Sequence, residues 1–317
     1  MSIPITYQDI SNYIISRQGF DPLELRRQTF EAIEKITGNS LVCYVTKTAN
    51  IIPGSAVSID EDDINGFSDL VRTTPSDNLD VFVISNGGSP TAAERIVRLL
   101  REKYKKLRFF VTGNAYSAAT IMCFSANEII MHSQGTLGPI DPQINGIPAY
   151  AILKSFEEVE EKLKKEGPAS LTAYMPLIAK YDLHLFNICR NSQQLSEELA
   201  KQYLKEYMFL GDKKTDDEIA AIVGFFMDHG LHKSHGRSID RNTAKSKGLK
   251  IIYSEENKEL DPLLLSLFNQ YQFFFGQSPF YKLFENARGI NWGKANQQIP
   301  IPIQTIPNQQ MFQINPS

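Results

Sequence analysis

The stretch F-F-V-T-G-N-A-Y-S-A-A-T-I-M-C-F-S-A, residues 109–126, carries the pattern that decides the fold. Its first part is an apolar, β-rich run that predicts a buried strand, and its last part is small and apolar, which suits a buried helix. The turn between them brings Ser117 to the N-terminal end of that helix. Functional sites of open α/β sheets lie at such turns. The dipole and free N–H groups of the helix could stabilise negative charge formed at Ser117, but serine is also an ordinary N-cap residue.

The alternation of strand and helix continues on both sides of this stretch. Four apolar, β-rich runs predict strands: residues 41–46, 79–85, 107–112 and 128–132. Of the helices between them, we expect one to run to about Arg72 with Ser58 or Asp60 as its N-cap, and another to begin near Thr91. This alternation favours an α/β fold with a mainly parallel sheet and helices on both faces.

The rest of the chain adds helical appendages to this unit. We expect residues 1–38 to form a helical lead-in and residues 39–255 to form the main domain, which ends in a helix capped near Asp240 and a closing strand. Residues 256–295 are rich in Phe, Tyr and Leu and are expected to form a helical segment that packs on the domain or on another subunit. Prolines recur too often in residues 296–317 for a helix or a central strand, so we expect an extended or disordered tail.

Composition and charge argue against several classes of protein. A net charge of −3 and a pI near 6.0 give no electrostatic reason to expect nucleic acid as a partner. The three cysteines lie far apart among apolar neighbours, which predicts buried thiols and no disulfide framework. No apolar stretch reaches the roughly 18–20 residues of a membrane span, and the N-terminus lacks the pattern of a signal peptide. The sequence therefore predicts a cytoplasmic protein with no membrane span.

A second turn with chemical potential follows the strand at residues 79–85. It reads Asn86-Gly87-Gly88, and paired glycines allow backbone N–H groups to approach a ligand closely, as an oxyanion hole requires. Taken alone, the pair is also explained by chain reversal.

The order of these pieces resembles the serine dehydrogenase proteinase family, a distant relative of the Clp peptidase and of signal peptide peptidase A. The resemblance is carried by I-S-N-G-G-S-P at 84–90, A-Y-S-A-A at 115–119 and L-G-P-I-D-P-Q at 137–143. In that family a P-G-G turn, an A-M-S-G-G-like turn and an L-G-P-V-D-P-Q segment follow one another in this order. The resemblance covers roughly residues 40–250 and implies a Clp/crotonase-type fold.

The resemblance implies a serine hydrolase, most closely a peptidase, with Ser, Asp and His in that chain order. The nucleophile falls on Ser117, the aspartate on Asp141 and the histidine on His235 in K-S-H-G-R-S-I-D. His235 would take the serine proton and Asp141 would orient the imidazole, while the N–H groups of Gly87 and Ala118 would form the oxyanion hole. The resemblance further implies a peptide or protein substrate, no metal or organic cofactor, and a homo-oligomer, because relatives of this fold form rings or trimers.

The chain departs from the family pattern in three places. Asn86 replaces the proline of P-G-G, Ala118 and Ala119 replace the glycines after the serine, and G-R-S follows the histidine where the family has D-Y-P. Ala118 still supplies a backbone N–H for an oxyanion hole, but the two added methyl groups could narrow the pocket.

Other residues are alternatives for parts of this site. An aspartate before proline, such as Asp141, is also a good turn residue. His132, directly after a strand, is an alternative base. Related peptidases of this fold use a lysine downstream of the serine, where Lys154 and Lys162 occur in a charged helix whose lysines are more simply explained as a solvated face.

A histidine-rich run and two other functions complete the alternatives. His229, His232 and His235 have metal-like spacing, but they form no helical i,i+4 pair and have no cysteines nearby, so we expect no zinc site. One rival function is a non-catalytic scaffold of the same fold, in which Ser117 only caps a helix and the aromatic C-terminal segment docks a partner. The other is a crotonase-like acyl-CoA enzyme that uses the two N–H groups on a thioester. No G-x-x-x-x-G-K-[ST] loop is present, so any ATP dependence would need another protein.

Overall fold

The computed structural model describes residues 3–17, 21–167, 171–179 and 183–296, and its centre is a mostly parallel sheet. The strands follow the spatial order β11-β10-β1-β2-β3-β4-β9, and the short strands β5 and β8 are attached beside β3. Strands β1 to β4 and β9 are parallel to one another, whereas β10 and β11 are antiparallel. The strands of this sheet are β1 (Ser40–Thr46), β2 (Asn78–Ser85), β3 (Lys106–Ala115), β4 (Glu128–Met131), β5 (Thr136–Leu137), β8 (Ile239–Asp240), β9 (Ile251–Tyr253), β10 (Phe280–Asn286) and β11 (Asn291–Ala295).

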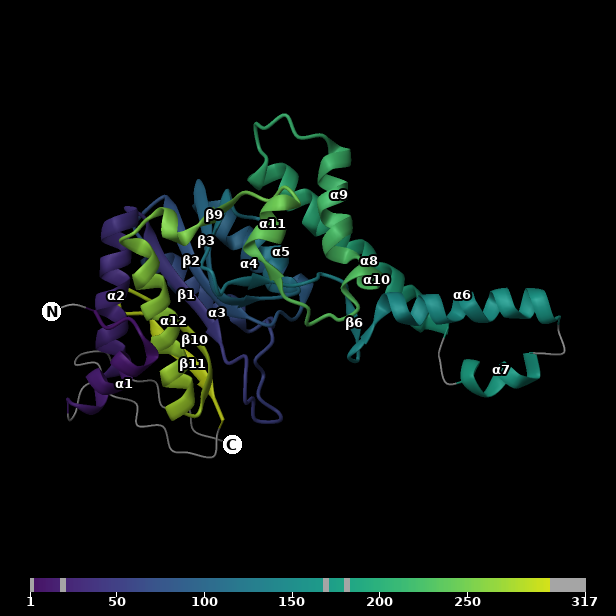
Figure 1. The fold of residues 1–317 in the computed structure, drawn as a ribbon, viewed down its shortest axis with the longest axis horizontal. Helices are drawn as coiled ribbons and strands as arrows, with labels where there is room; N and C mark the ends of the chain where they lie inside the picture. Colours follow the sequence, from purple (N-terminus) through teal and green to yellow (C-terminus); the bar gives the residue numbers. More distant parts are fainter. Residues whose placement is uncertain (1–2, 18–20, 168–170, 180–182, 297–317) are drawn as a thin grey trace.

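Helices cover both faces of the sheet, which confirms the predicted fold class (Figure 1). A separate hairpin is formed by β6 (Gln143–Ile144) and β7 (Ile147–Pro148). The helices are α1 (Tyr7–Ile15), α2 (Pro22–Thr37), α3 (Asp63–Thr73), α4 (Pro90–Lys103), α5 (Ala118–Phe124), α6 (Ala149–Glu166), α7 (Leu171–Ile178), α8 (Leu183–Tyr203), α9 (Asp216–Met227), α10 (His229–His232), α11 (Arg241–Ser246) and α12 (Leu260–Gln277), with the π-helix η2 (Leu204–Met208) and the 3₁₀-helix η3 (Ser254–Glu256).

The alternation of side chains along the strands divides the core into two layers. In β1, Val42 and Tyr44 join the apolar cluster that contains α3, α4 and α5, while Leu41, Cys43 and Val45 join the cluster beneath α2 and α12. This division follows from the two-residue period of a strand, whose successive side chains point to opposite faces. A sheet that is buried on both faces explains why its central strands are almost continuously apolar.

One predicted helix start is wrong. Helix α3 begins at Asp63 with Asp62 at its N-cap position, and neither Ser58 nor Asp60 caps it. Asp60 instead accepts the N–H of Asp62 at 3.1 Å, in the turn that precedes the helix. The Asp60 carboxylate and the Ser58 carbonyl also accept hydrogen bonds from Lys282, more than two hundred residues further along the chain.

The helical prediction for residues 256–295 is also only partly right. Helix α12 is present, but residues after Ser278 form the hairpin β10–β11, which extends the sheet beside β1. The antiparallel register pairs Val42 with Asn286 and Thr46 with Lys282. Helical periodicity cannot predict this hairpin, because the partner strand is remote in sequence. The predicted tail, residues 296–317, lies outside the described residues except for Asn296.

Helices α6 and α7 extend away from the rest of the molecule (Figure 1). The base of α6 packs against α8 through Ala149, Ile152 and Cys189, and all three cysteines of the chain are buried and free, as predicted. No helix in the described part of the chain is both long and apolar enough to cross a membrane.

Candidate active site

Ser117 lies in a strained turn between β3 and α5. Its backbone angles are φ 53° and ψ −121°, a region that residues with a side chain rarely occupy. Although Ser117 occupies the N-cap position of α5, its side chain makes no capping hydrogen bond. By contrast, Ser89 caps α4 with φ −67° and ψ 120°, and its hydroxyl accepts a 3.2 Å hydrogen bond from the N–H of Ala92. The ordinary N-cap interpretation therefore describes Ser89 but does not describe Ser117.

The paired glycines lie directly against Ser117. Gly87 has φ 91°, and a Cβ atom added to it would lie 2.7 Å from the Cβ of Ser117, so this position requires glycine. The N–H of Gly87 donates to the Ser85 hydroxyl at 3.1 Å. Within the described part of the chain, the N–H groups of Gly88 and Ala118 have no acceptor. Two free backbone donors therefore occur on the two turns that meet at Ser117.

The L-G-P-I-D-P-Q segment packs against the same turn. The Thr120 hydroxyl of α5 donates to the Gly138 carbonyl at 3.0 Å, and the N–H of Gly138 donates to that hydroxyl at 3.1 Å. A Cβ atom on Gly138 would lie 2.8 Å from the ring of Tyr116. The glycine of this motif is thus required for close packing against the residue that precedes Ser117.

Asp141 is buried and is shared by two histidines. One carboxylate oxygen lies 2.8 Å from Nδ1 of His235, and the other lies 3.0 Å from Nδ1 of His229. The side-chain amide of Gln143 also donates to Asp141, at 3.0 Å. Only 3% of the Asp141 side chain is exposed, compared with 27% for His235 and 17% for His229. A carboxylate on Nδ1 leaves Nε2 of each ring available for proton transfer.

The loop that carries His235 is held next to the serine turn. Strand β8 pairs antiparallel with β5, and the Ser238 hydroxyl lies 2.7 Å from the hydroxyl of Tyr116. The structure therefore brings Asp141 and His235 together, as the resemblance implied, and places the loop of His235 beside Tyr116. Among the described residues no hydrogen bond joins Ser117 to either histidine, and such bonds often form only when substrate is bound.

His229 was not predicted as part of a catalytic site. The sequence feature that includes His229 is the spacing of His229, His232 and His235, which is typical of metal ligands and does not indicate a catalytic role. His229 and His235 do converge on one carboxylate, whereas Nε2 of His232 lies 2.7 Å from the Phe225 carbonyl. Within the described residues, no group of three or more His, Cys, Asp or Glu side chains is arranged to hold a metal ion.

None of the alternative bases makes a hydrogen bond or ion pair with Asp141 in the described part of the chain. Nδ1 of His132 accepts a hydrogen bond from the N–H of Gln134, and its Nε2 lies 3.8 Å from Asp261. The ammonium of Lys154 lies over the Tyr150 ring, and a hydrogen bond with Tyr150 raises the lysine pKa, which disfavours a neutral base. Lys162 lies over a different ring, that of Tyr174.

We expect His132 to give the stability of the fold a pH dependence. Burial lowers the pKa of His132 below its ordinary value of 6.5, although Asp261 opposes this shift. The folded state therefore favours the neutral imidazole, so this contribution to stability is present above about pH 6.5 and is lost as the pH falls through the lower folded pKa. We expect His132→Gln to lose less stability than the wild type between pH 7 and pH 5, measured by urea unfolding. Parallel losses in the two proteins would contradict this expectation.

Parts of this chain are similar to a known protein family and to known sequences. A model of the ClpP-like SDH-type serine proteinases matches residues 36–221, which include Ser117 and Asp141 but end before His229 and His235. Two uncharacterised proteins of Methanocaldococcus jannaschii are similar in sequence. One is 29% identical over 137 residues, 43% of this chain and 46% of the relative. The other is 34% identical over 89 residues, 28% of this chain and 31% of the relative. The chain thus matches less than half the length of either curated relative.

Three solved structures are similar to this chain at low identity and with TM-scores below 0.5. A ClpP1 mutant from Listeria monocytogenes is 15% identical, with a TM-score of 0.35 over 70% of this chain and 96% of that one. Two mutants of the membrane-bound stomatin-specific protease 1510-N, one in complex with a substrate peptide, are 14% and 15% identical. Each has a TM-score of 0.37 over 64% of this chain, and the match covers 78% and 74% of their chains. Because the family model matches more than half of the 317 residues, the chain belongs to the ClpP-like SDH-type serine proteinase family.

Proposed function

We propose that the protein is a serine peptidase in which Ser117 is the nucleophile. The observation that carries this proposal is the backbone of Ser117, which is held at φ 53° without a capping hydrogen bond to compensate for the strain. Strain of this kind persists where the surrounding structure imposes it, and it is concentrated at functional sites. The strained backbone leaves the Ser117 hydroxyl free at the point where the Asn86-Gly87-Gly88 turn meets the Ser117 turn. A non-catalytic scaffold would not require this strained conformation of Ser117.

We propose that His235 is the general base and that Asp141 orients it. The 2.8 Å contact with Asp141 holds the proton of a neutral His235 ring on Nδ1, so Nε2 is the nitrogen that accepts the Ser117 proton as Oγ attacks the scissile carbonyl. The resulting imidazolium then gives this proton to the leaving amine. In the second half of the reaction, His235 takes a proton from the water that attacks the acyl-enzyme and returns it to the Ser117 oxygen as the ester bond breaks. We assign this role to His235 rather than His229 because Ser238 ties its loop to Tyr116.

For the oxyanion hole, we propose the N–H groups of Ala118 and Gly88. The sequence pointed to Gly87 as the partner of Ala118, but the Gly87 N–H already donates to Ser85. The Gly88 N–H lies one residue further along the same turn and has no acceptor within the described part of the chain. Two free donors beside the nucleophile provide the arrangement that stabilises a tetrahedral oxyanion.

We also propose a peptide or protein substrate and a homo-oligomeric assembly. Family membership supports the substrate class. The protruding helices support an assembly, because they and the neighbouring β7 carry exposed apolar side chains: Ile147, Tyr150, Leu171 and Met175.

A fluorophosphonate probe tests the nucleophile directly. The probe reacts when a serine oxygen attacks phosphorus, fluoride leaves, and the proton passes to the base. We expect the wild-type protein to be labelled at Ser117, Ser117→Ala to remain unlabelled, and His235→Ala to react at least about 100-fold more slowly. Peptide mass spectrometry locates the label, and Ser155→Ala on the exposed side of α6 is the control that keeps it. A folded wild-type protein that resists the probe, in every assembly state that can be isolated, would favour the scaffold function.

A further inference from the structure

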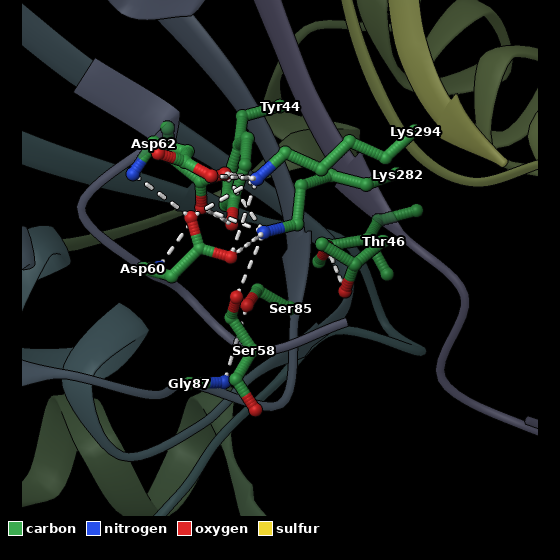
Figure 2. A network of polar contacts seen from close by, with 11 residues as sticks. Tyr44, Thr46, Ser58, Asp60, Asp62, Ser85, Gly87, Lys282 and Lys294 are labelled. Atoms are coloured by element: carbon green, nitrogen blue, oxygen red, sulfur yellow. Dashed lines mark hydrogen bonds and ion pairs between the residues drawn. The ribbon is translucent and has the colours of Figure 1, made fainter. Parts of the chain in front are cut away.

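The C-terminal hairpin buries a lysine ammonium close to the glycine turn. Lys282 on β10 is 0% exposed, and its Nζ donates to both carboxylate oxygens of Asp63, at 2.7 and 2.9 Å. The same Nζ donates to the Ser58 carbonyl at 2.8 Å and to Asp60 at 3.1 Å. Figure 2 shows this ammonium between Asp60 and the Ser58 carbonyl, with Gly87 and Ser85 beyond. A buried ammonium is stable only when it is fully paired, and here every partner comes from the segment before and at the start of α3.

The partners of Lys282 hold the segment Ser58-Ile59-Asp60 in place. Asp63, itself fully buried, also accepts the Tyr44 hydroxyl at 2.7 Å, which anchors it to β1. Lys294 on β11 donates to Asp60 at 3.1 Å. Because hydrogen bonds to a carbonyl and to carboxylates are directional, this network fixes the position of the segment, which apolar packing alone would fix less sharply.

The segment in turn fixes the glycine turn. The N–H of Ile59 donates to the Gly87 carbonyl at 2.8 Å, and the N–H of Ser89 donates to the Ile59 carbonyl at 2.9 Å. These two bonds form a parallel bridge between Ile59 and Gly88. A Cβ atom on Gly88 would collide with the backbone of Ile59, so the two chains are as close as glycine permits. A continuous chain of polar contacts therefore runs from β10 to the proposed oxyanion donor.

The opposite face of β10 carries a matched buried ion pair without this connection. Glu285 is also 0% exposed, but it binds Arg26 of α2, on the face away from the glycine turn. The hairpin lies outside residues 36–221, the part of the chain that matches the family model. The support for the turn is thus supplied by residues beyond the matched segment.

We propose that Lys282 is a positioning residue for the oxyanion turn, acting through residues 58–60 on Gly88. This inference rests on the proposed function, because it assigns the Gly88 N–H to the oxyanion hole. It makes the C-terminal hairpin a part of the catalytic apparatus that never contacts substrate. Loss of the ammonium releases the Ser58 carbonyl and allows the Gly87–Gly88 turn to shift against the neighbouring Ser117 turn.

The test compares Lys282→Met with Glu285→Gln, two changes to equally buried charges on opposite faces of one strand. Both variants are expected to lose thermal stability and are assayed well below their melting temperatures. We expect Lys282→Met to react with the fluorophosphonate about 100-fold more slowly, the effect of losing one oxyanion donor, and Glu285→Gln to react within about threefold of the wild type. For a peptide substrate, the loss in Lys282→Met is expected in kcat rather than in KM.

Hydrogen–deuterium exchange provides a readout that does not depend on activity. The amides of Ile59 and Ser89, which form the bridge, are expected to exchange at least 10-fold faster in Lys282→Met and at the wild-type rate in Glu285→Gln. If Lys282→Met does not fold, the double variant Lys282→Met/Asp63→Asn, which also removes the unpaired carboxylate, is used instead.

The outcomes separate this inference from the proposed function. Wild-type labelling and unchanged amide exchange in Lys282→Met would overturn the positioning role. Equal slowing in Lys282→Met and Glu285→Gln would also overturn it, because the effect would then follow stability alone. A wild-type protein that is not labelled at Ser117 would remove the proposed function, and amide exchange would then decide by itself whether Lys282 holds the turn.

Discussion

Replacing Asp141 with asparagine is expected to lower kcat by about 10⁴-fold with little change in the fold, the size of effect found when the aspartate of a Ser-His-Asp triad is changed in this way. Asp141 accepts hydrogen bonds from Nδ1–H of His235 and from Nδ1–H of His229. An asparagine offers one acceptor and one NH₂ donor to these two rings. Whichever ring faces the NH₂ group must present a bare Nδ1 and carry its proton on Nε2, where it can no longer act as a base.

The measurement combines peptide hydrolysis with circular dichroism, so that loss of activity is separated from loss of fold. Gln143→Ala is the matched control, because it removes another hydrogen bond to the same carboxylate, at 3.0 Å, without changing the state of either ring. We expect that variant to keep activity within about tenfold. His229→Ala separates the two rings, and under our assignment it is far less damaging than His235→Ala. Because an asparagine can keep its oxygen toward His235 and turn its NH₂ group toward His229, Asp141→Ala is the decisive variant. An active Asp141→Ala enzyme would show that Asp141 does not orient the base.

Replacing Glu285 with alanine is expected to reduce the free energy of unfolding by about 3–5 kcal/mol, because it leaves a buried guanidinium without its counter-charge. Arg26 and Glu285 form a two-pronged pair at 2.9 and 2.8 Å, with exposed fractions of 2% and 0%. The Tyr271 hydroxyl also donates to Glu285, at 2.7 Å, so three elements of the structure meet at this carboxylate.

Urea unfolding at constant pH measures this loss. Glu24→Ala is the matched control, because it breaks an arginine–glutamate pair with Arg27 on the same helix, whose side chains are 50% and 39% exposed. Exposed pairs of this kind contribute less than about 1 kcal/mol. The double variant Arg26→Met/Glu285→Leu is expected to be more stable than Glu285→Ala, since it leaves no buried charge unpaired. A Glu285→Ala protein as stable as Glu24→Ala would contradict the argument.

The position of Ser117 is easier to read from the sequence than the rest of the proposed site. Ser117 stands in a local pattern of strand, turn and buried helix, and such a pattern is readable because its parts are adjacent in the chain. His229 and His235 lie 88 and 94 residues from Asp141, and their meeting at one carboxylate depends on how β5 and β8 pair. The resemblance supplied His235, but nothing local indicated His229 as its companion.

What the sequence by itself determined is the alternating order of elements and the position of the serine turn within it, because the two-residue period of strands, the periodicity of helices and the turn residues act over short distances. The hairpin at Phe280–Ala295 was mistaken for helix, and only the tertiary structure placed it on β1. The same pairing set Lys282 beside Ser58 and Asp60, contacts that no local pattern predicts. Local preferences for a cap or a helix change stability by about 1 kcal/mol per residue. Leaving a buried ammonium without partners costs more than this, so tertiary pairing outweighs those local preferences.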